Sequence, residues 1–118
     1  MQKTIICPPP VTLLGFDGQP LHKDEKQTVL EDPFDMRRVF NRFIYIDKKI
    51  GQGRKAGQFV ARCNKALDSL VDNVLTLDEA DYVIIRDIIQ NPSDASAWPP
   101  PVILSQLEHV FTAIENAK

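Results

Sequence analysis

Residues 75–92 read LTLDEADYVIIRDIIQNP, and the interpretation of this stretch decides the fold class. Its centre, YVIIRDII, is rich in β-branched residues and resembles a strand. Its start favours a helix, because Thr76 and Glu79 have the spacing of a capping box, and Leu75 and Ala80 have that of a hydrophobic staple. The acids Asp78, Glu79 and Asp81 favour the first turn of a helix, and Pro92 would end the helix. We therefore predict a helix with Thr76 as its N-cap.

Three other segments have the apolar period of an amphipathic helix. One starts at Asp32, which can cap it, continues with Pro33 at the first helical position and ends before Gly51. The second covers residues 55–72, and the last follows the proline-rich loop 91–101. Their apolar stripes are Met36, Val39, Phe40, Phe43 and Ile44; then Phe59, Val60, Cys63, Leu67, Leu70, Val71 and Val74; then Ile103, Leu107, Val110, Phe111 and Ile114.

The N-terminal residues predict a small β-hairpin. Residues 3–7 and 11–16 read as strands, Asp17-Gly18 is a two-residue turn signal, and residues 22–31 form a polar linker. The chain of 118 residues has the length of one domain. We therefore predict a mainly α (α+β) fold, in which residues 1–31 form a hairpin arm and linker and residues 32–118 form a helical domain that resembles a four-helix bundle.

Charge is sorted along the chain. Residues 48–65, KKIGQGRKAGQFVARCNK, hold six basic residues and no acid, although the net charge is −2. Residues 66–118 hold nine acids against Arg86 and Lys118. Sorted charge bears on partners rather than on fold. The predicted partner-binding residues are Lys48, Lys49, Arg54, Lys55, Arg62 and Trp98.

The basic segment has three readings. The motif GQGRKAG lacks the spacing of a dinucleotide or Walker loop, so it offers at most backbone N–H groups and two cations to an anion. A solvated face is the simplest reading, and contact with an acidic protein surface comes next. Nucleic acid is a third, and Arg37, Arg38 and Arg42 would extend such a surface. A sequence pI near 5.6 and the lack of interleaved aromatic residues count against nucleic acid.

No residue pattern indicates catalysis, a cofactor or a metal. Cys7 and Cys63 are expected to be buried reduced thiols, with a disulfide as the alternative, and His22 and His109 are isolated. Ser93, Ser96 and Ser105 lack a nucleophile elbow, and Asp78, Glu79 and Asp81 have the places that helix-dipole compensation alone would give them. We expect a non-enzymatic protein without cofactor or metal.

Trp98 stands among prolines in the loop before the last helix. A Trp in such a loop either plugs the core or makes a contact spot, and we favour the plug, because the short last helix needs an anchor. Apolar runs are far too short to span a bilayer, and the N-terminal one is too short for a signal peptide, so we expect a cytosolic protein without membrane contact.

Four features together resemble small proteins of tailed bacteriophages and prophages encoded in the virion-assembly region, some of which are tail assembly chaperones. They are Asp17-Gly18, Leu75-Thr76-Leu77-Asp78-Glu79, Pro99 to Val102 and Ala113-Ile114. The resemblance implies protein–protein contact in tail or virion assembly, with a tape-measure protein or another tail or head component as partner. It places the protein in the host cytoplasm or in the virion.

An alternative function is regulation or inhibition of a host nucleic-acid-binding enzyme. A compact acidic protein can mimic phosphates if its carboxylates line one face. The candidate mimics are Asp68, Asp72, Asp78, Asp81 and Asp87. Direct nucleic-acid binding through residues 48–65 is the third hypothesis.

Overall fold

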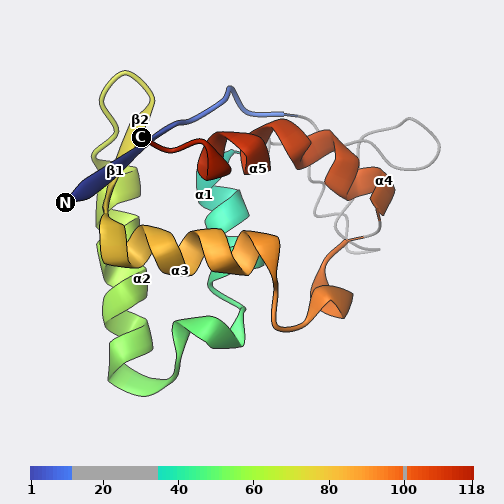
Figure 1. The fold of residues 1–118 in the computed structure, drawn as a ribbon, viewed down its shortest axis with the longest axis horizontal. Coiled ribbons are helices and arrows are strands. Elements are labelled where there is room, and N and C mark those ends of the chain that lie inside the picture. The colour runs from blue at the N-terminus through green and yellow to red at the C-terminus, as the bar shows by residue number, and fades with distance from the viewer. Residues whose placement is uncertain (12–34, 100) are drawn as a thin grey trace, which may run out of the picture.

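Two short strands, far apart in the sequence, form an antiparallel sheet in the computed structural model, which describes residues 1–11, 35–99 and 101–118 (Figure 1). Strand β1 (Gln2–Ile6) pairs with β2 (Val74–Asp78), and Ile5 lies opposite Leu75. Both of these side chains are fully buried, so the inner face of the sheet belongs to the core. The predicted strand at residues 3–7 is confirmed, but its partner is β2. The predicted turn Asp17-Gly18 and the linker 22–31 lie outside the described residues.

Strand β2 corrects the predicted start of the third helix. Thr76 lies opposite Thr4 in the sheet, so it does not cap a helix. Helix α3 (Glu79–Gln90) begins three residues later, with Asp78 in the N-cap position. The capping-box pattern was misleading because strand pairing with β1 satisfies the backbone of these residues instead. The helical identity of the segment YVIIRDII is confirmed.

A tight turn at Asp72 and Asn73 introduces β2. Both residues have positive φ, +53° and +63°, and they connect Val71 to Val74 across an isolated antiparallel bridge. Positive φ at both central residues is characteristic of a type I′ hairpin turn. Because of this turn, helix α2 (Gly53–Asp68) ends four residues before the predicted residue 72. Val71 is therefore outside the helix and 69% exposed.

The first predicted helix begins at Met36 and is short. Asp35 is the N-cap of α1 (Met36–Val39), and its carboxylate accepts a hydrogen bond from the Arg38 N–H at 3.0 Å. The predicted cap Asp32 lies outside the described residues. The helix continues as a wider π-helical turn, Phe40–Ile44, in which the Tyr45 N–H donates to the Phe40 carbonyl.

The last predicted helix is divided into short pieces. These are α4 (Pro101–Leu104), a 3₁₀ turn (Ser105–Leu107) and α5 (Glu108–Glu115). The chain then returns to β1, where Thr4 and Lys118 exchange two backbone hydrogen bonds of 2.9 and 3.0 Å. Two further 3₁₀ turns, Lys48–Ile50 and Ala95–Ala97, lie in the connections before α2 and α4.

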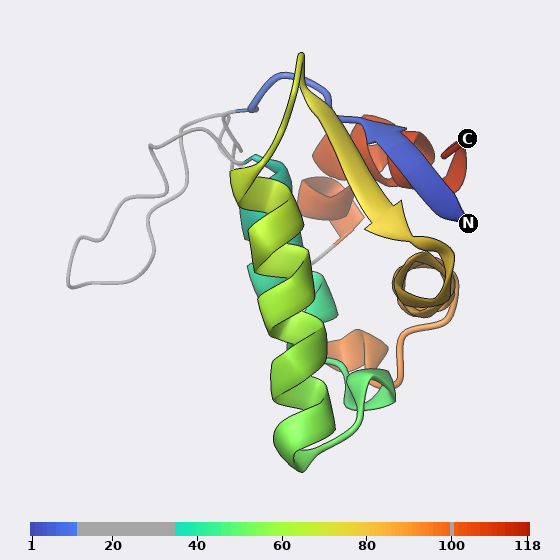
Figure 2. The same cartoon turned by 90° about the vertical axis from the view of Figure 1, so that its left-hand side faces the viewer.

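The elements enclose one hydrophobic core, and most of the predicted apolar stripes are in it. Figures 1 and 2 show that α3 runs across α2 rather than alongside it. The predicted mainly helical fold with a small sheet is confirmed, whereas a four-helix bundle is not. None of the helices in the described residues is long and apolar enough to cross a membrane. The buried stripe residues are Met36, Val39, Phe40, Phe43, Ile44, Phe59, Cys63, Leu67, Leu107, Val110, Phe111 and Ile114.

Candidate functional site

Arg62, one of the predicted partner-binding residues, forms an internal ion pair. Its Nε donates to Oδ2 of Asp81 at 2.8 Å, and its Nη2 donates to Oδ1 at 2.9 Å. Asp81 is 5% exposed, whereas half of the Arg62 side chain remains accessible. The hydrogen bond to Asp81 raises the pKa of the Arg62 guanidinium, and the charges of Asp81 and Asp78 add to this effect. Arg62 therefore holds α2 against α3.

Lys48 and Lys49 belong to a polar junction between the 3₁₀ turn Lys48–Ile50 and the end of α3. Lys49 Nζ lies 3.0 Å from a carboxylate oxygen of Asp87 and also donates to the Asn91 carbonyl. The backbone N–H of Lys48 donates to Oγ of Ser93 at 3.1 Å. Lys49 is thus used within the fold, and the Lys48 side chain is exposed.

Asp47 is the buried centre of this junction, with 6% of its surface exposed. Its two carboxylate oxygens accept hydrogen bonds from the backbone N–H groups of Lys49, at 2.9 Å, and Ser93, at 2.8 Å. Burial by itself would raise the pKa of Asp47, but these hydrogen bonds and the charge of Lys49 lower it overall. The carboxylate caps the 3₁₀ turn and fixes the loop after α3.

Charge that is sorted along the sequence is thus paired across the fold. Arg37 bonds to Asp68, Lys49 to Asp87 and Arg62 to Asp81. In each pair a cation from residues 37–62 meets an acid from residues 68–87. These internal pairs account for part of the sorted charge, and they use three of the five acids that would mimic phosphates.

Arg54 and Lys55 remain exposed in the first turn of α2. Gly51, before the helix, and Gly53, its first residue, have φ of +87° and +69°, a region that glycine tolerates best. The side chain of Gln52, the N-cap residue, makes no capping hydrogen bond. Neither cation forms an ion pair within the described residues.

Trp98 packs into the edge of the core. Its indole ring lies 4.8 Å from the Phe43 ring and 5.7 Å from the Phe111 ring, measured between centroids. The residue is half-buried. This packing is the anchoring role that the loop sequence predicts, and it ties the loop before α4 to α5.

Two cysteines and two histidines were considered from the sequence as potentially reactive groups. Cys7 and Cys63 are free thiols, and burial raises the pKa of both, that of Cys63 to about 12. Among the described residues, no group of three or more His, Cys, Asp or Glu side chains could hold a metal ion. His109 is exposed on α5, and His22 lies outside the described residues.

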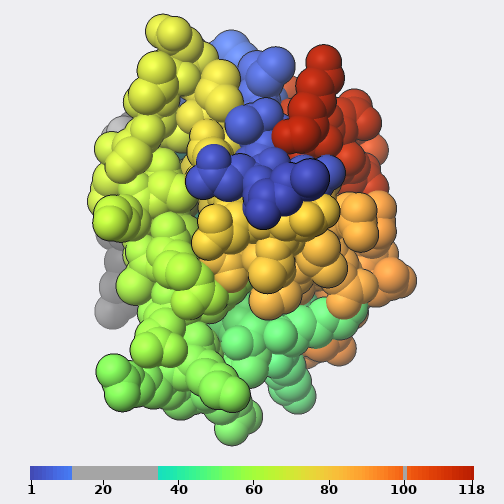
Figure 3. Space-filling view, turned by 60° about the vertical axis from the view of Figure 1, so that its left-hand side comes forward, coloured from blue at the N-terminus to red at the C-terminus, as the bar shows by residue number. Residues whose placement is uncertain are grey.

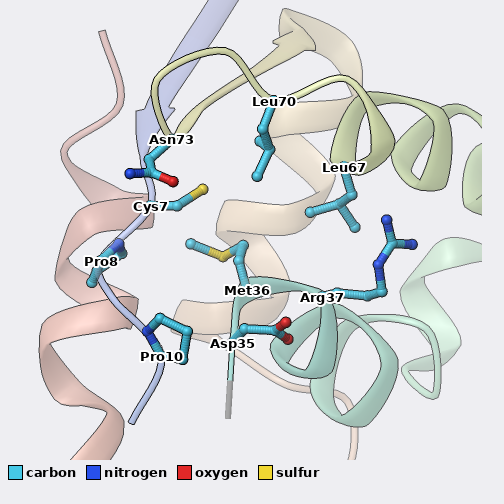
Figure 4. A pocket seen from close by; sticks show the side chains of 9 residues that line it. All are labelled: Cys7, Pro8, Pro10, Asp35, Met36, Arg37, Leu67, Leu70 and Asn73. Atoms are coloured by element: carbon cyan, nitrogen blue, oxygen red, sulfur yellow. The ribbon is translucent and has the colours of Figure 1, made fainter. Parts of the chain in front are cut away.

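A groove that the sequence analysis missed lies between the start of α1 and the end of α2 (Figure 4). Its volume is about 250 Å³. Met36, Leu67 and Leu70 point into it, as Figure 4 shows, and the first two are almost fully buried. The lining residues are Cys7, Pro8, Pro10, Asp35, Met36, Arg37, Leu67, Leu70 and Asn73.

The groove combines an apolar floor with a charged rim. The sulfur-containing and aliphatic side chains form the floor, and Asp35 and Arg37 stand at one side. Its walls come from three separate stretches of the chain, so no local motif could indicate it. Met36, Leu67 and Leu70 were predicted as parts of apolar stripes, but the sequence did not indicate that they line one groove.

Comparisons of this chain with protein-family models, with curated proteins and with solved structures give no match, so its function has to be argued from the fold itself.

Proposed function

We propose that this protein is a non-enzymatic binding protein of phage virion assembly that acts by contact with other assembly proteins. The observation that supports the proposal best is the apolar groove beside α1 and α2. An assembly chaperone must cover apolar surface on its partner, and a groove between helices with charges at its rim is suited to that task. The resemblance to small tailed-phage proteins supports the same class of partner, a tape-measure protein or a tail or head component.

The groove is large enough for an apolar side chain of a partner protein. Its volume is about 250 Å³, and its floor is apolar. An apolar side chain from a partner helix could pack on Met36 and Leu67. The Arg37 guanidinium, which bonds to Asp68 through one nitrogen, has further N–H groups that could bond to an acid or a carbonyl of the same partner.

Leu70 provides the test, because it lines the groove and is 39% exposed. The Leu70→Glu variant should fold, since the side chain already contacts water. We expect it to lose the partner that the tagged wild-type protein captures from cells in which particles assemble. Val83→Glu is the matched control, because Val83 is 44% exposed on α3, outside the residues that line the groove.

Three results would count against the proposal. The captured protein could be unrelated to assembly, the Leu70→Glu variant could capture it as well as the wild type does, or the Val83→Glu variant could lose it equally. Mass spectrometry of purified particles then separates two roles. A chaperone should be absent from mature particles, whereas a minor structural component should be present in fixed stoichiometry.

The other hypotheses predict different results. An inhibitor of a host enzyme should capture a host nuclease or polymerase through its acids, but only Asp72 and Asp78 of the five candidates are exposed and outside the ion pairs of the described residues. A nucleic-acid-binding protein should give a salt-dependent gel shift that is lost when Arg54 and Lys55 become Ala.

A further inference from the structure

Helix α2 presents one continuous face to solvent, and its opposite face is in the core. The buried stripe consists of Phe59, Cys63 and Leu67, which are spaced four residues apart. With 100° per residue, Arg54, Ala61 and Lys65 lie directly opposite that stripe. All three are exposed, and Figure 3 shows the helix as an uncovered column of atoms along one side of the molecule.

The charged residues of this face are all basic from Arg54 to Lys65. Between Gly53 and Leu67 the helix contains no acid, and Arg54, Lys55 and Lys65 form no ion pair within the described residues. Arg62 adds a half-exposed guanidinium on the flank toward α3. Since Arg54 and Lys55 stand at the positive end of the helix dipole, they do not serve the stability of α2. A binding role explains their position better than a structural one.

The shape of the face suits a second helix. Arg54 and Lys65 are about 16 Å apart along the axis, or three turns, at about 1.5 Å per residue. Gln58 and Ala61 lie between them on the same row, Gly57 lies beside that row, and a Cβ at Gly57 would meet no atom within 4 Å. The small side chains of Gly57 and Ala61, on one side of Gln58, leave room for the backbone of a second helix to approach.

The surrounding acids favour a protein over a nucleic acid. Asp68 lies at the C-terminal end of the face, and Asp78 is close enough to Arg62 to affect its pKa. These carboxylates, Asp68 in its ion pair with Arg37 and Asp78 near Arg62, interrupt the positive charge that a continuous row of phosphates would need. A helix with a few well-spaced carboxylates can meet Arg54 and Lys65 and avoid both acids.

We propose that the exposed face of α2 is a second docking surface, which binds an acidic helical segment of a protein partner. This inference rests on the proposed function in protein–protein contact, but it uses residues that do not line the groove. Carboxylates of the partner pair with Arg54 and Lys65, and its backbone passes over Gly57 and Ala61.

The test uses three synthetic probes and the ¹⁵N-labelled full chain. The first probe is an Ala-based helical peptide with Glu at positions i, i+4, i+7 and i+11, the second has Gln in place of Glu, and the third is a duplex DNA of similar length. We expect the Glu peptide to shift the amide signals of residues 53–68, and the Gln peptide and the DNA to bind more weakly.

Single charge reversals locate the site. Arg54→Glu and Lys65→Glu should each raise the Kd of the Glu peptide by about fivefold, the upper end of the value of an exposed ion pair. Lys118→Glu is the control, because Lys118 bonds to Thr4 through its backbone and should retain full binding. Arg54→Glu should not lower the Tm, since an acid suits the helix N-terminus; a lower Tm would indicate a structural role for Arg54.

Several outcomes would overturn the inference. The Glu peptide could shift no amide signals, or only signals outside α2. Lys118→Glu could lose binding as much as Arg54→Glu and Lys65→Glu do. The duplex could bind more tightly than the Glu peptide, which would indicate nucleic acid as the partner. The peptide test does not involve Leu70. A negative result therefore leaves the groove proposal standing, and a failure of the Leu70→Glu test leaves this surface standing.

Discussion

Arg62 on α2 and Asp81 on α3 form a two-point ion pair with N···O distances of 2.8 and 2.9 Å. The carboxylate is buried and the guanidinium is half-exposed. The pair therefore links two crossing helices, and the carboxylate that it uses has little contact with water. A bidentate geometry of this kind is specific to arginine.

Loss of the Arg62 side chain should destabilise the fold. Arg62→Ala would leave the Asp81 carboxylate buried without its main partner, at a cost of roughly 1–3 kcal/mol in the free energy of unfolding. Arg62→Lys should recover only part of this, because lysine cannot make both bonds. Urea denaturation measures the difference. A cost for Arg62→Ala within the error of the method would show that the pair is dispensable.

Asp47 should be more important for stability than Asp94, although each caps a short 3₁₀ turn. Asp47→Ala removes the acceptors of two N–H groups at a buried site, and we expect a loss of roughly 1–2 kcal/mol. Asp94→Ala should cost less, because that carboxylate is exposed. Equal effects in urea denaturation would contradict the central place of Asp47.

Asp47 should also make stability depend on acid pH. The pKa of Asp47 is lower in the folded protein than in the unfolded chain. The carboxylate therefore stabilises the fold at a pH above its pKa in the unfolded chain, and this stabilisation is lost as the pH falls through its pKa in the folded protein. The wild type should lose stability below about pH 4 more steeply than Asp47→Ala does. Parallel curves for the two proteins would be evidence against this linkage.

Alkaline pH should destabilise the fold through Cys63. Burial, together with the charge of Asp81, raises the pKa of this thiol to about 12 in the folded protein. The neutral thiol therefore stabilises the fold at a pH below the pKa that Cys63 has in the unfolded chain. Above that pH the stabilisation is lost by roughly 1.4 kcal/mol per pH unit. Unfolding midpoints between pH 7.5 and 10 should fall more steeply for the wild type than for Cys63→Ala. Identical slopes would disagree with a buried thiol at this position.

Trp98 should stabilise the junction between the loop before α4 and α5. Trp98→Ala removes its contacts with Phe43 and Phe111, and we expect a loss of roughly 2 kcal/mol, less than for a fully buried Trp. Trp98→Phe should recover part of the loss. If Trp98→Ala unfolds like the wild type but fails to bind a partner, the indole serves contact rather than packing.

The turn at Asp72 and Asn73 should restrict which residues are tolerated. Asn73 has φ of +63°, which Gly adopts freely and a β-branched residue does not. Asn73→Val should cost roughly 1–2 kcal/mol in the free energy of unfolding, whereas Asn73→Gly should be neutral or stabilising. A well-tolerated Val would mean that the turn can rearrange without loss.

Local patterns in the sequence determined where the helices lie and most of the side chains that they bury. The stripe Phe59, Cys63 and Leu67 is in the core because a 3.6-residue period leaves one face of a helix apolar whatever its neighbours are. The helical identity of residues 79–90 and the anchoring of Trp98 followed from similarly local signals. These signals depend only on residues a few positions apart.

Only the tertiary structure decided the boundaries, the sheet and the surface. Thr76 is in a strand because it pairs with Thr4, 72 positions earlier, and this pairing outweighs a local capping pattern. The groove is built from three distant stretches, and the sorted charges of Arg62 and Asp81 meet in space. Contacts between residues far apart in the chain leave no periodic trace in the sequence, so composition shows the charges but not which of them remain free to bind a partner.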